Sequence, residues 1–250
     1  MHFRFRASGF HLLFSAGVAL IAAMIVVFVW YPPPYLTLAG GLRLFGILIG
    51  IDLVLGPLLT AIIASPSKPK PELRRDISLI VLVQLLAFAY GMYTIALARP
   101  VYLVFEVDRL QVVNAVDIDS SQLGKALPEY RQLPWTGPSL LSTRKAATQA
   151  EMTRSLDLGL QGTDVAMQPE RWINFASDSE AVLQKARPAK VLLDRYPQIA
   201  DQLKTLTDQT GVTPAAMYFL PMISRQQSGV AILASPDARF LRYMPVEGFF

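Results

Sequence analysis

Three long apolar stretches stand out in the first hundred residues, at residues 12–31, 44–64 and 77–97, and Asp52 is the one charged residue within them. At a rise of 1.5 Å per residue, about twenty helical residues span a hydrocarbon core of about 30 Å. The pattern therefore predicts a membrane domain of three transmembrane helices over residues 1–99, followed by a separate domain over residues 100–250.

Residues 100–250 have the mixed pattern of a water-soluble domain. Segments rich in β-branched and aromatic residues predict strands at residues 101–107 and 110–118, as a hairpin, and at 216–220, 229–234 and 239–244. Segments of helix-forming residues after polar caps predict helices at residues 120–127, 143–158, 178–186 and 198–208. This order predicts an α+β domain with a mainly antiparallel sheet. The distribution of basic residues predicts that this domain is periplasmic.

The basic residues predict how the helices are oriented. Arg4 and Arg6 precede the first stretch, whereas residues 31–42, between the first two stretches, carry no charge. The loop between the second and third stretches contains a cytoplasmic basic group: Lys68, Lys70, Arg74 and Arg75. Because loops rich in Lys and Arg stay in the cytoplasm, we expect a multi-pass protein of the bacterial inner membrane with a cytoplasmic N-terminus and a periplasmic C-terminal domain. The lipid bilayer is the expected partner of the basic group.

The composition excludes several classes of protein. The chain has no Cys, which excludes disulfides, thiolate nucleophiles and Cys-ligated metal sites. Its two histidines are His2 and His11, so no residue after His11 can supply an imidazole base or a His metal ligand. Residues 1–99 hold eight basic and three acidic residues against 15 and 16 in the rest, so nucleic acid is not an expected partner. Asp108, Asp117 and Asp119 lack the Gly and closing Glu of a calcium loop and are expected to be surface carboxylates. We expect no catalytic residue, metal ion or cofactor.

Asp52 is the most informative residue of the membrane domain, because a carboxylate near the middle of a bilayer is costly unless it is paired. Counted from the cytoplasmic ends of their helices, Asp52 and Tyr90 lie at the same depth. Tyr90 is therefore the predicted hydrogen-bond partner, whereas Gln84 lies about two turns closer to the cytoplasm. His11 is expected to reach the membrane interface.

Small residues in the second and third stretches allow helices to approach closely. Gly46 and Gly50 are one turn apart, and the Gly56-Pro57 pair should kink the second helix. Packing among the protein's own helices is the favoured interpretation of the small residues, and a docking face for another membrane helix is the alternative. The hypothetical partner-binding set in the membrane is Gly46, Gly50, Asp52, Gly56, Pro57, Gln84, Tyr90 and Gly91.

Several segments occur in a recognisable order and spacing. They are FRASGFHLLFS (residues 5–15), WYPPPY (30–35), GIDLVLGPLLT (50–60), ELRRDI (72–77) and ARPVYLVFEVDR (98–109). With them the chain resembles the TfpX/TfpZ-type type IV pilin accessory proteins. The likeness is dense over the first 118 residues and thinner beyond, and none of these motifs is catalytic.

The resemblance implies a protein that binds its cognate major type IV pilin, as a chaperone or a modulator of pilus assembly, and that meets other components of the assembly machine. It implies that Asp52, the face of Gly46 and Gly50, and the Gly56-Pro57 pair contact the apolar helix of the pilin and that residues 100–250 contact its head. The alternative is a membrane-anchored periplasmic sensor that binds a ligand, although its cytoplasmic segments are too short for an output domain. A transporter is disfavoured because three membrane helices with one buried acidic residue are too few to make a good transporter.

Overall fold

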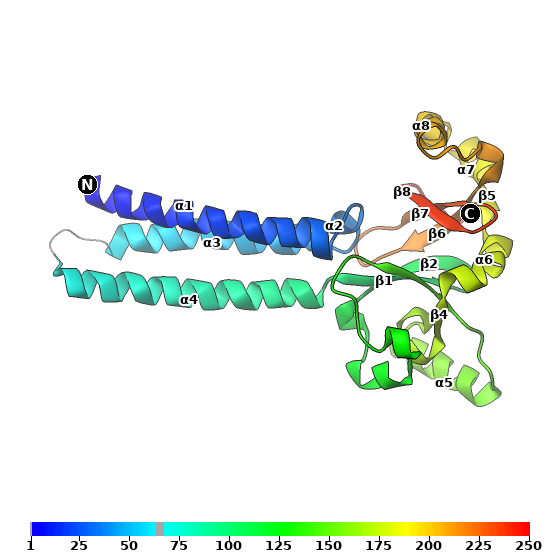
Figure 1. The fold of residues 1–250 in the computed structure, drawn as a ribbon, viewed down its shortest axis with the longest axis horizontal. Helices are drawn as coiled ribbons and strands as arrows, with labels where there is room; N and C mark the ends of the chain where they lie inside the picture. The colour runs from blue at the N-terminus through cyan, green and yellow to red at the C-terminus, as the bar shows by residue number, and fades with distance from the viewer. Residues whose placement is uncertain (1, 64–67) are drawn as a thin grey trace. The chain divides into compact units, whose positions relative to one another are not determined.

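The computed structural model describes residues 2–63 and 68–250, with side chains from Ser8 onward within these ranges. The chain forms two compact units, Met1–Arg99 and Pro100–Phe250. Figure 1 shows long helices in the first unit and a sheet with surrounding helices in the second.

Long helices make up the first unit. Helix α1 (His2–Met24) continues into a π-helix (Ile25–Trp30), the short helix α2 (Tyr35–Leu38) follows, and α3 (Gly41–Ile63) and α4 (Lys70–Leu97) complete the unit. Among the described residues, three helices are long and apolar enough to cross a membrane, over Ser8–Trp30, Gly41–Ile63 and Lys70–Leu97. The prediction of three such helices is confirmed. Ala64, the last residue of the second expected span, lies outside the described residues.

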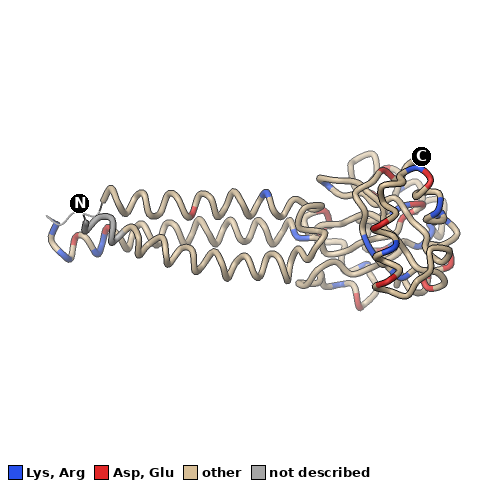
Figure 2. The backbone as a smooth tube through the Cα atoms, turned by 90° about the horizontal axis from the view of Figure 1, so that it is seen from above, with Lys and Arg blue, Asp and Glu red and all other residues tan. Residues whose placement is uncertain are grey.

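Helix α4 begins seven residues before the apolar stretch that predicts it. Pro69 has an extended backbone just ahead of the helix, and Glu72 places an acidic side chain in the first turn, which favours a helix N-terminus. Lys70, Arg74 and Arg75 therefore lie on the first turns of α4 and not in a loop. Charged residues are sparse along the middle of the long helices (Figure 2).

Helix α3 packs against both α1 and α4. At one end of the unit, Tyr31 is fully buried, and its hydroxyl donates a hydrogen bond to the Ile95 main-chain oxygen at 2.8 Å. A Cβ at Gly41 would lie 2.6 Å from the Tyr31 ring, so the close approach requires glycine. This contact joins the segment after α1 to the start of α3 and the end of α4.

The second unit, which is described throughout, is built around an eight-stranded sheet of order β4-β3-β1-β2-β6-β7-β8, with β5 also paired to β6. The strands are β1 (Pro100–Glu106), β2 (Arg109–Asn114), β3 (Ser139–Thr143), β4 (Trp172–Asn174), β5 (Arg187–Pro188), β6 (Met217–Ile223), β7 (Gly229–Ala234) and β8 (Arg239–Met244). The α-helices are α5 (Gln149–Leu160), α6 (Ser179–Lys185), α7 (Ala189–Arg195) and α8 (Ala200–Thr210).

The sheet is mixed, and the prediction of a mainly antiparallel sheet is wrong. Strands β1 and β2 form the predicted antiparallel hairpin, but β3 pairs with β1 in parallel and β6 pairs with β2 in parallel. Both of these neighbours reach the hairpin through long connections, so no tight turn forces the chain to reverse direction. The other strand pairs are antiparallel.

Buried apolar side chains hold the helices and turns against this sheet. One cluster surrounds Trp172, which packs on Tyr102 with ring centroids 4.8 Å apart and donates its indole N–H to the Ala166 oxygen at 2.8 Å. Another cluster lies between strands β6 to β8 and helices α7 and α8, with Leu192 and Phe219 fully buried in it.

Most expected elements of the second unit are confirmed within a few residues, and the errors lie in its middle. Strands β7 and β8 have the predicted bounds. The segment Ser120–Lys125 forms 3₁₀ turns instead of an α-helix. Thr143 ends strand β3, because helix α5 starts only after Thr148, whose hydroxyl caps it by accepting from Glu151 N at 3.1 Å. The sequence pattern predicts neither β3 nor β4 nor α7.

Candidate functional site

Gln84 of α4 is the centre of a polar cluster among the three long helices. Its Nε2 donates to Asp52 Oδ1 at 2.7 Å and lies 3.1 Å from both the Asp52 main-chain oxygen and the Ser15 hydroxyl. Its Oε1 lies 2.8 Å from His11 Nε2, and His11 Nδ1 lies 2.7 Å from the Thr60 hydroxyl. We call these five residues the interhelical polar cluster; they come from α1, α3 and α4.

The predicted hydrogen bond between Asp52 and Tyr90 is wrong, because Gln84 takes this place. The Tyr90 side chain is 73% exposed on the outer face of α4. Counting residues from a helix end gives depth but not the direction in which a side chain points. Positions seven residues apart, such as Gln84 and Gly91, share a helix face, and Tyr90 is turned about 100° away from Gly91.

His11 faces the two neighbouring helices and lies near the start of the candidate span Ser8–Trp30. Helix α1 begins at His2, so His11 is well inside it, and its half-buried ring bonds to both neighbouring helices. Because Gln84 turns its amide N–H groups to Asp52, its oxygen faces His11 and accepts a hydrogen bond from Nε2, while Nδ1 is bonded to the Thr60 hydroxyl. The signal that sequence reasoning missed is the set of polar residues, Ser15 and Thr60 included, inside apolar stretches.

The predicted small residues divide into two groups. A side chain at Gly56 would collide with the amide at the centre of the polar cluster, and a Cβ at Gly91 would lie 2.5 Å from Leu48 Cδ1. These two glycines therefore serve the close packing of α3 on α4. Gly46 and Gly50 are exposed instead, and a Cβ at either position meets no described atom within 4 Å.

Pro57 is buried inside α3, next to the packed Gly56. Proline removes one N–H from the hydrogen-bond ladder of a helix. The Pro57 main-chain oxygen accepts a hydrogen bond from the Ser8 hydroxyl at 2.8 Å. The Gly56-Pro57 pair thus faces two helices. Gly56 leaves room for Gln84 of α4, and the Pro57 carbonyl bonds to Ser8 of α1.

A groove of about 400 Å³ runs between α3 and α4 beside the polar cluster. Its walls are mostly aliphatic and aromatic: Leu48, Ile51, Leu55, Leu59, Leu79, Ile80, Val83, Ala87 and Phe88. Asp52 and Gln84 supply the polar part of the lining. Asp52 also lines a cavity of about 20 Å³ between α1 and α4, which has room for about one water molecule.

The basic group at the start of α4 is partly neutralised. Lys68 Nζ lies 2.8 Å from Asp76 Oδ2, and Arg75 Nη2 lies 3.7 Å from Asp76 Oδ1. Lys70 and Arg74 are exposed. Two cations of this group therefore share a carboxylate, and the other two present their charge at the helix surface.

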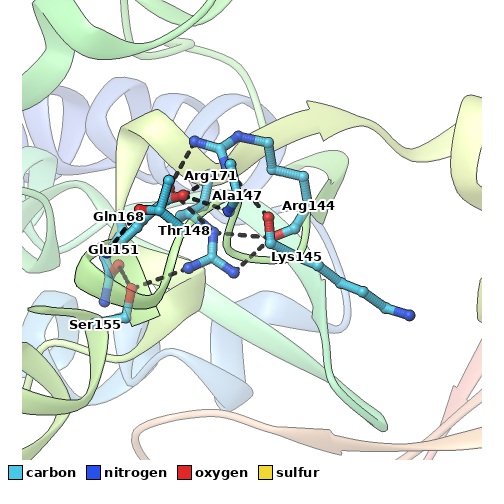
Figure 3. Close-up of polar contacts among 8 residues, drawn as sticks. All are labelled: Arg144, Lys145, Ala147, Thr148, Glu151, Ser155, Gln168 and Arg171. Atoms are coloured by element: carbon cyan, nitrogen blue, oxygen red, sulfur yellow. Dashed lines mark hydrogen bonds and ion pairs between the residues drawn. The ribbon is translucent and has the colours of Figure 1, made fainter. Parts of the chain in front are cut away.

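In the second unit, a buried polar cluster fastens α5 to strands β3 and β4 (Figure 3). Arg171 is 6% exposed, and its Nε and Nη2 donate to the Arg144 main-chain oxygen at 2.8 and 2.6 Å. Its Nη1 donates to the Ser155 hydroxyl at 3.0 Å, which donates to Gln168 Oε1 at 2.7 Å. The Arg144 guanidinium binds Glu151 through two hydrogen bonds of 2.7 and 3.1 Å. These bonds are the main reason that the pKa of Glu151 is lowered to about 2.

Glu106, at the end of β1, is a buried carboxyl of the second unit with 6% exposure. Its Oε2 accepts from Ala166 N at 2.8 Å, and Arg109 Nε lies 3.9 Å from its Oε1. Burial is the main cause that raises the pKa of Glu106, and the hydrogen bond from Ala166 and the charge of Arg109 oppose this shift.

The described residues contain no group of three His, Asp or Glu side chains placed to hold a metal ion. Asp117 accepts from Asn114 N at 2.9 Å and pairs with Arg225, whereas Asp119 accepts from Ser121 N at 2.9 Å. Both carboxylates cap turns beside the strands. Asp119 is at the surface as predicted, whereas the Asp117 side chain is only 6% exposed.

Several known proteins from Dichelobacter nodosus are similar to this chain. The fimbrial assembly proteins of serogroup I and serogroup E1 are 36% and 35% identical to it over 248 residues, which cover 99% of this chain and 96% of each relative. The fimbrial assembly protein of serogroups C1 and C2 is 46% identical over 124 residues, or 50% of this chain and 95% of that relative.

The sequence model of the family described as fimbrial assembly protein FimB matches residues 1–40. No solved structure matches the chain. Identity above 30% extends over nearly the whole length of this chain and of two relatives. The chain therefore belongs to the fimbrial assembly protein (FimB) family.

Proposed function

We propose that this chain is an inner-membrane accessory protein of type IV pilus assembly that binds its cognate major pilin, as a chaperone or a modulator of assembly. The observation that carries the proposal is its likeness, over 99% of its length, to proteins named for fimbrial assembly. The three helices that could cross a membrane supply a means of meeting another membrane protein before it leaves the bilayer. The protein acts by binding and not by catalysis.

The first unit offers the kinds of surface that bind helices in a bilayer. Lipid tails are as apolar as Leu, so membrane helices associate through close packing and interhelical hydrogen bonds. The exposed Gly46 and Gly50 permit close packing, and the groove beside Asp52 offers both packing and a polar group. Either surface suits the apolar helix of a pilin.

The second unit offers an exposed apolar face on α5. Met152, Leu156 and Leu160 are spaced by four residues, so they lie on one side of the helix, and all three are exposed. Exposed apolar side chains that gather on one face are typical of interaction surfaces. We assign this face to contact with the head of the pilin in the periplasm.

In-membrane crosslinking in the parent bacterium tests the proposal. The tagged full-length protein is purified after crosslinking, and its partners are identified by mass spectrometry. We expect the major pilin as the leading partner, absent when the pilin gene is deleted, with other assembly components at lower yield. A tagged, unrelated three-helix membrane protein is the control. Recovery of a signalling protein or a small molecule without pilin would favour the sensor alternative.

A further inference from the structure

Asp52 has one carboxylate oxygen without a partner. Its Oδ1 accepts from Gln84, but no described residue donates to its Oδ2, and no described Lys, Arg or His forms an ion pair with it. The side chain is nevertheless 8% exposed and belongs to a helix that could cross a membrane. In hydrocarbon, an unpaired polar oxygen carries a free-energy cost that a donor or a cation removes.

The groove between α3 and α4 provides access to this carboxylate. Its lining on α3 extends from Leu48 to Leu59, which is about 16 Å of helix axis, or three turns. Asp52 lies within this length, on the same wall. A second helix lying along the groove would contact aliphatic side chains above and below Asp52.

We infer that this groove binds one apolar α-helix of the partner membrane protein, and that this helix brings a positively charged group to Asp52. The inference rests on the proposed function, in which the partner is the pilin. An acyl chain would fill the apolar walls but would leave Asp52 without a donor. A helix with a cation satisfies both the walls and the carboxylate, so the charge of the groove selects its occupant.

The face that carries Gly46 and Gly50 is the natural comparison surface. Neither glycine lines the groove, and neither lies beside an unpaired polar atom. Both surfaces belong to α3, so a partner at one surface can be distinguished from a partner at the other by the position of a crosslinker on the same helix.

The first experiment places a photo-crosslinking amino acid at single positions of the full-length protein in its native membrane. Leu55 and Val83 report on the groove, Gly50 on the comparison surface, and Ile21 on the exposed face of α1. We expect crosslinks from Leu55 and Val83 to the apolar helix of the pilin and none from Ile21.

The second experiment tests the charge. Asp52→Asn keeps an oxygen that can accept the Gln84 amide but removes the negative charge, so the helix unit should still fold. Removing the charge of one partner of a buried ion pair weakens binding, so we expect at least about a tenfold loss of pilin recovered with the protein. Thr94→Val is the control, because Thr94 is exposed on α4 outside both the groove and the polar cluster, and pilin recovery should be unchanged.

Four results would overturn the inference. Pilin crosslinked only from Gly50, or only from Leu156 of the second unit, would move the contact elsewhere and leave the proposed function intact. Lipid as the sole product from Leu55 and Val83 would assign the groove to an acyl chain. Full pilin recovery with Asp52→Asn would show that the charge has no role. A failure to recover pilin with the unmodified protein would reject the proposed function as well.

Discussion

The side-chain amide of Gln84 bonds to Asp52 twice, once through the carboxylate at 2.7 Å and once through the main-chain oxygen at 3.1 Å. The same amide nitrogen lies 3.1 Å from the Ser15 hydroxyl, and the amide oxygen lies 2.8 Å from His11. One side chain of α4 therefore contacts both α1 and α3. Its hydrogen bonds thus join all three long helices.

Gln84→Leu should destabilise the helix unit. The change removes the bonds to three residues and leaves Asp52 without a donor, and interhelical hydrogen bonds in membranes are worth about 0.6 kcal/mol on average, with a maximum near 1.7 kcal/mol. We expect a loss of about 1–2 kcal/mol in the free energy of unfolding, measured in detergent micelles. Tyr90→Phe is the control and should leave stability unchanged. An equal loss of stability in both variants would instead support the predicted hydrogen bond between Asp52 and Tyr90.

The two groups of glycines should respond differently to substitution. Gly91→Val places a branched side chain where Leu48 Cδ1 already lies 2.5 Å from an added Cβ, and overpacking costs about 1–3 kcal/mol. Gly50→Ala adds a methyl group where no described neighbour lies, so stability in detergent should change by less than about 0.5 kcal/mol. Thermal unfolding of both variants measures this. A large effect of Gly50→Ala would mean that Gly50 is covered, for example by a second copy.

Glu106 should make the protein less stable as the pH rises. Burial raises its pKa above the ordinary value of 4.5, so the native state keeps a proton that the unfolded chain releases. The free energy of unfolding therefore falls as the pH rises from about 4.5 through the native pKa. Glu106→Gln, which can still accept from Ala166 N, should flatten this dependence and be more stable above that range. Thermal unfolding of the full-length variant at several pH values measures it. A profile identical to that of the unmodified protein would contradict the assignment.

Glu151 should act in the opposite direction. Its hydrogen bonds with Arg144 lower its pKa to about 2, so the stability that it contributes is fully present above about pH 4.5 and is lost as the pH falls towards 2. Glu151→Gln should be less stable than the unmodified protein at pH 7 and equally stable near pH 2. Chemical denaturation at the two pH values measures the difference. A deficit that persists at pH 2 would show that the amide disturbs packing instead.

The absence of cysteine allows a direct test of orientation. Lys145→Cys and Lys70→Cys introduce single thiols at exposed positions of the second unit and of the start of α4. If the second unit is periplasmic, a membrane-impermeant maleimide should label Lys145→Cys in intact spheroplasts and Lys70→Cys only after permeabilisation. The unmodified protein, which has no thiol, is the control. The reverse labelling pattern would show that the protein has the opposite orientation in the membrane to the one predicted.

Local patterns predict the elements of this protein that depend on a few neighbouring residues. The long apolar stretches predict three helices, and the β-branched and aromatic segments at residues 229–234 and 239–244 predict strands β7 and β8. Strand β4 has three residues, and β3 contains Ser139, Ser142 and Thr143, so neither has a clear strand pattern. Their pairing depends on residues far away in the sequence, which one sequence does not reveal.

The sequence correctly predicts that Asp52 is paired within the helix unit, but it predicts the wrong hydrogen-bond partner. An acid in an apolar stretch is recognisable by itself, because its cost in lipid does not depend on its neighbours. The choice between Gln84 and Tyr90 depends on which face of α4 turns towards α3. Gly91 marks this face of α4, because a Cβ there would lie 2.5 Å from Leu48 of α3, and Gly56 of α3 lies against Gln84 on the same face.

The two outermost strands of the sheet determine how the second unit can associate with other chains. Strand β4 has only three residues, and β8 carries the cations Arg239 and Arg242. Short outer strands and charged side chains on them discourage the addition of a further strand from another molecule. Neither end of the sheet is thus suited to backbone pairing, and another protein that binds this domain must recognise it through side chains.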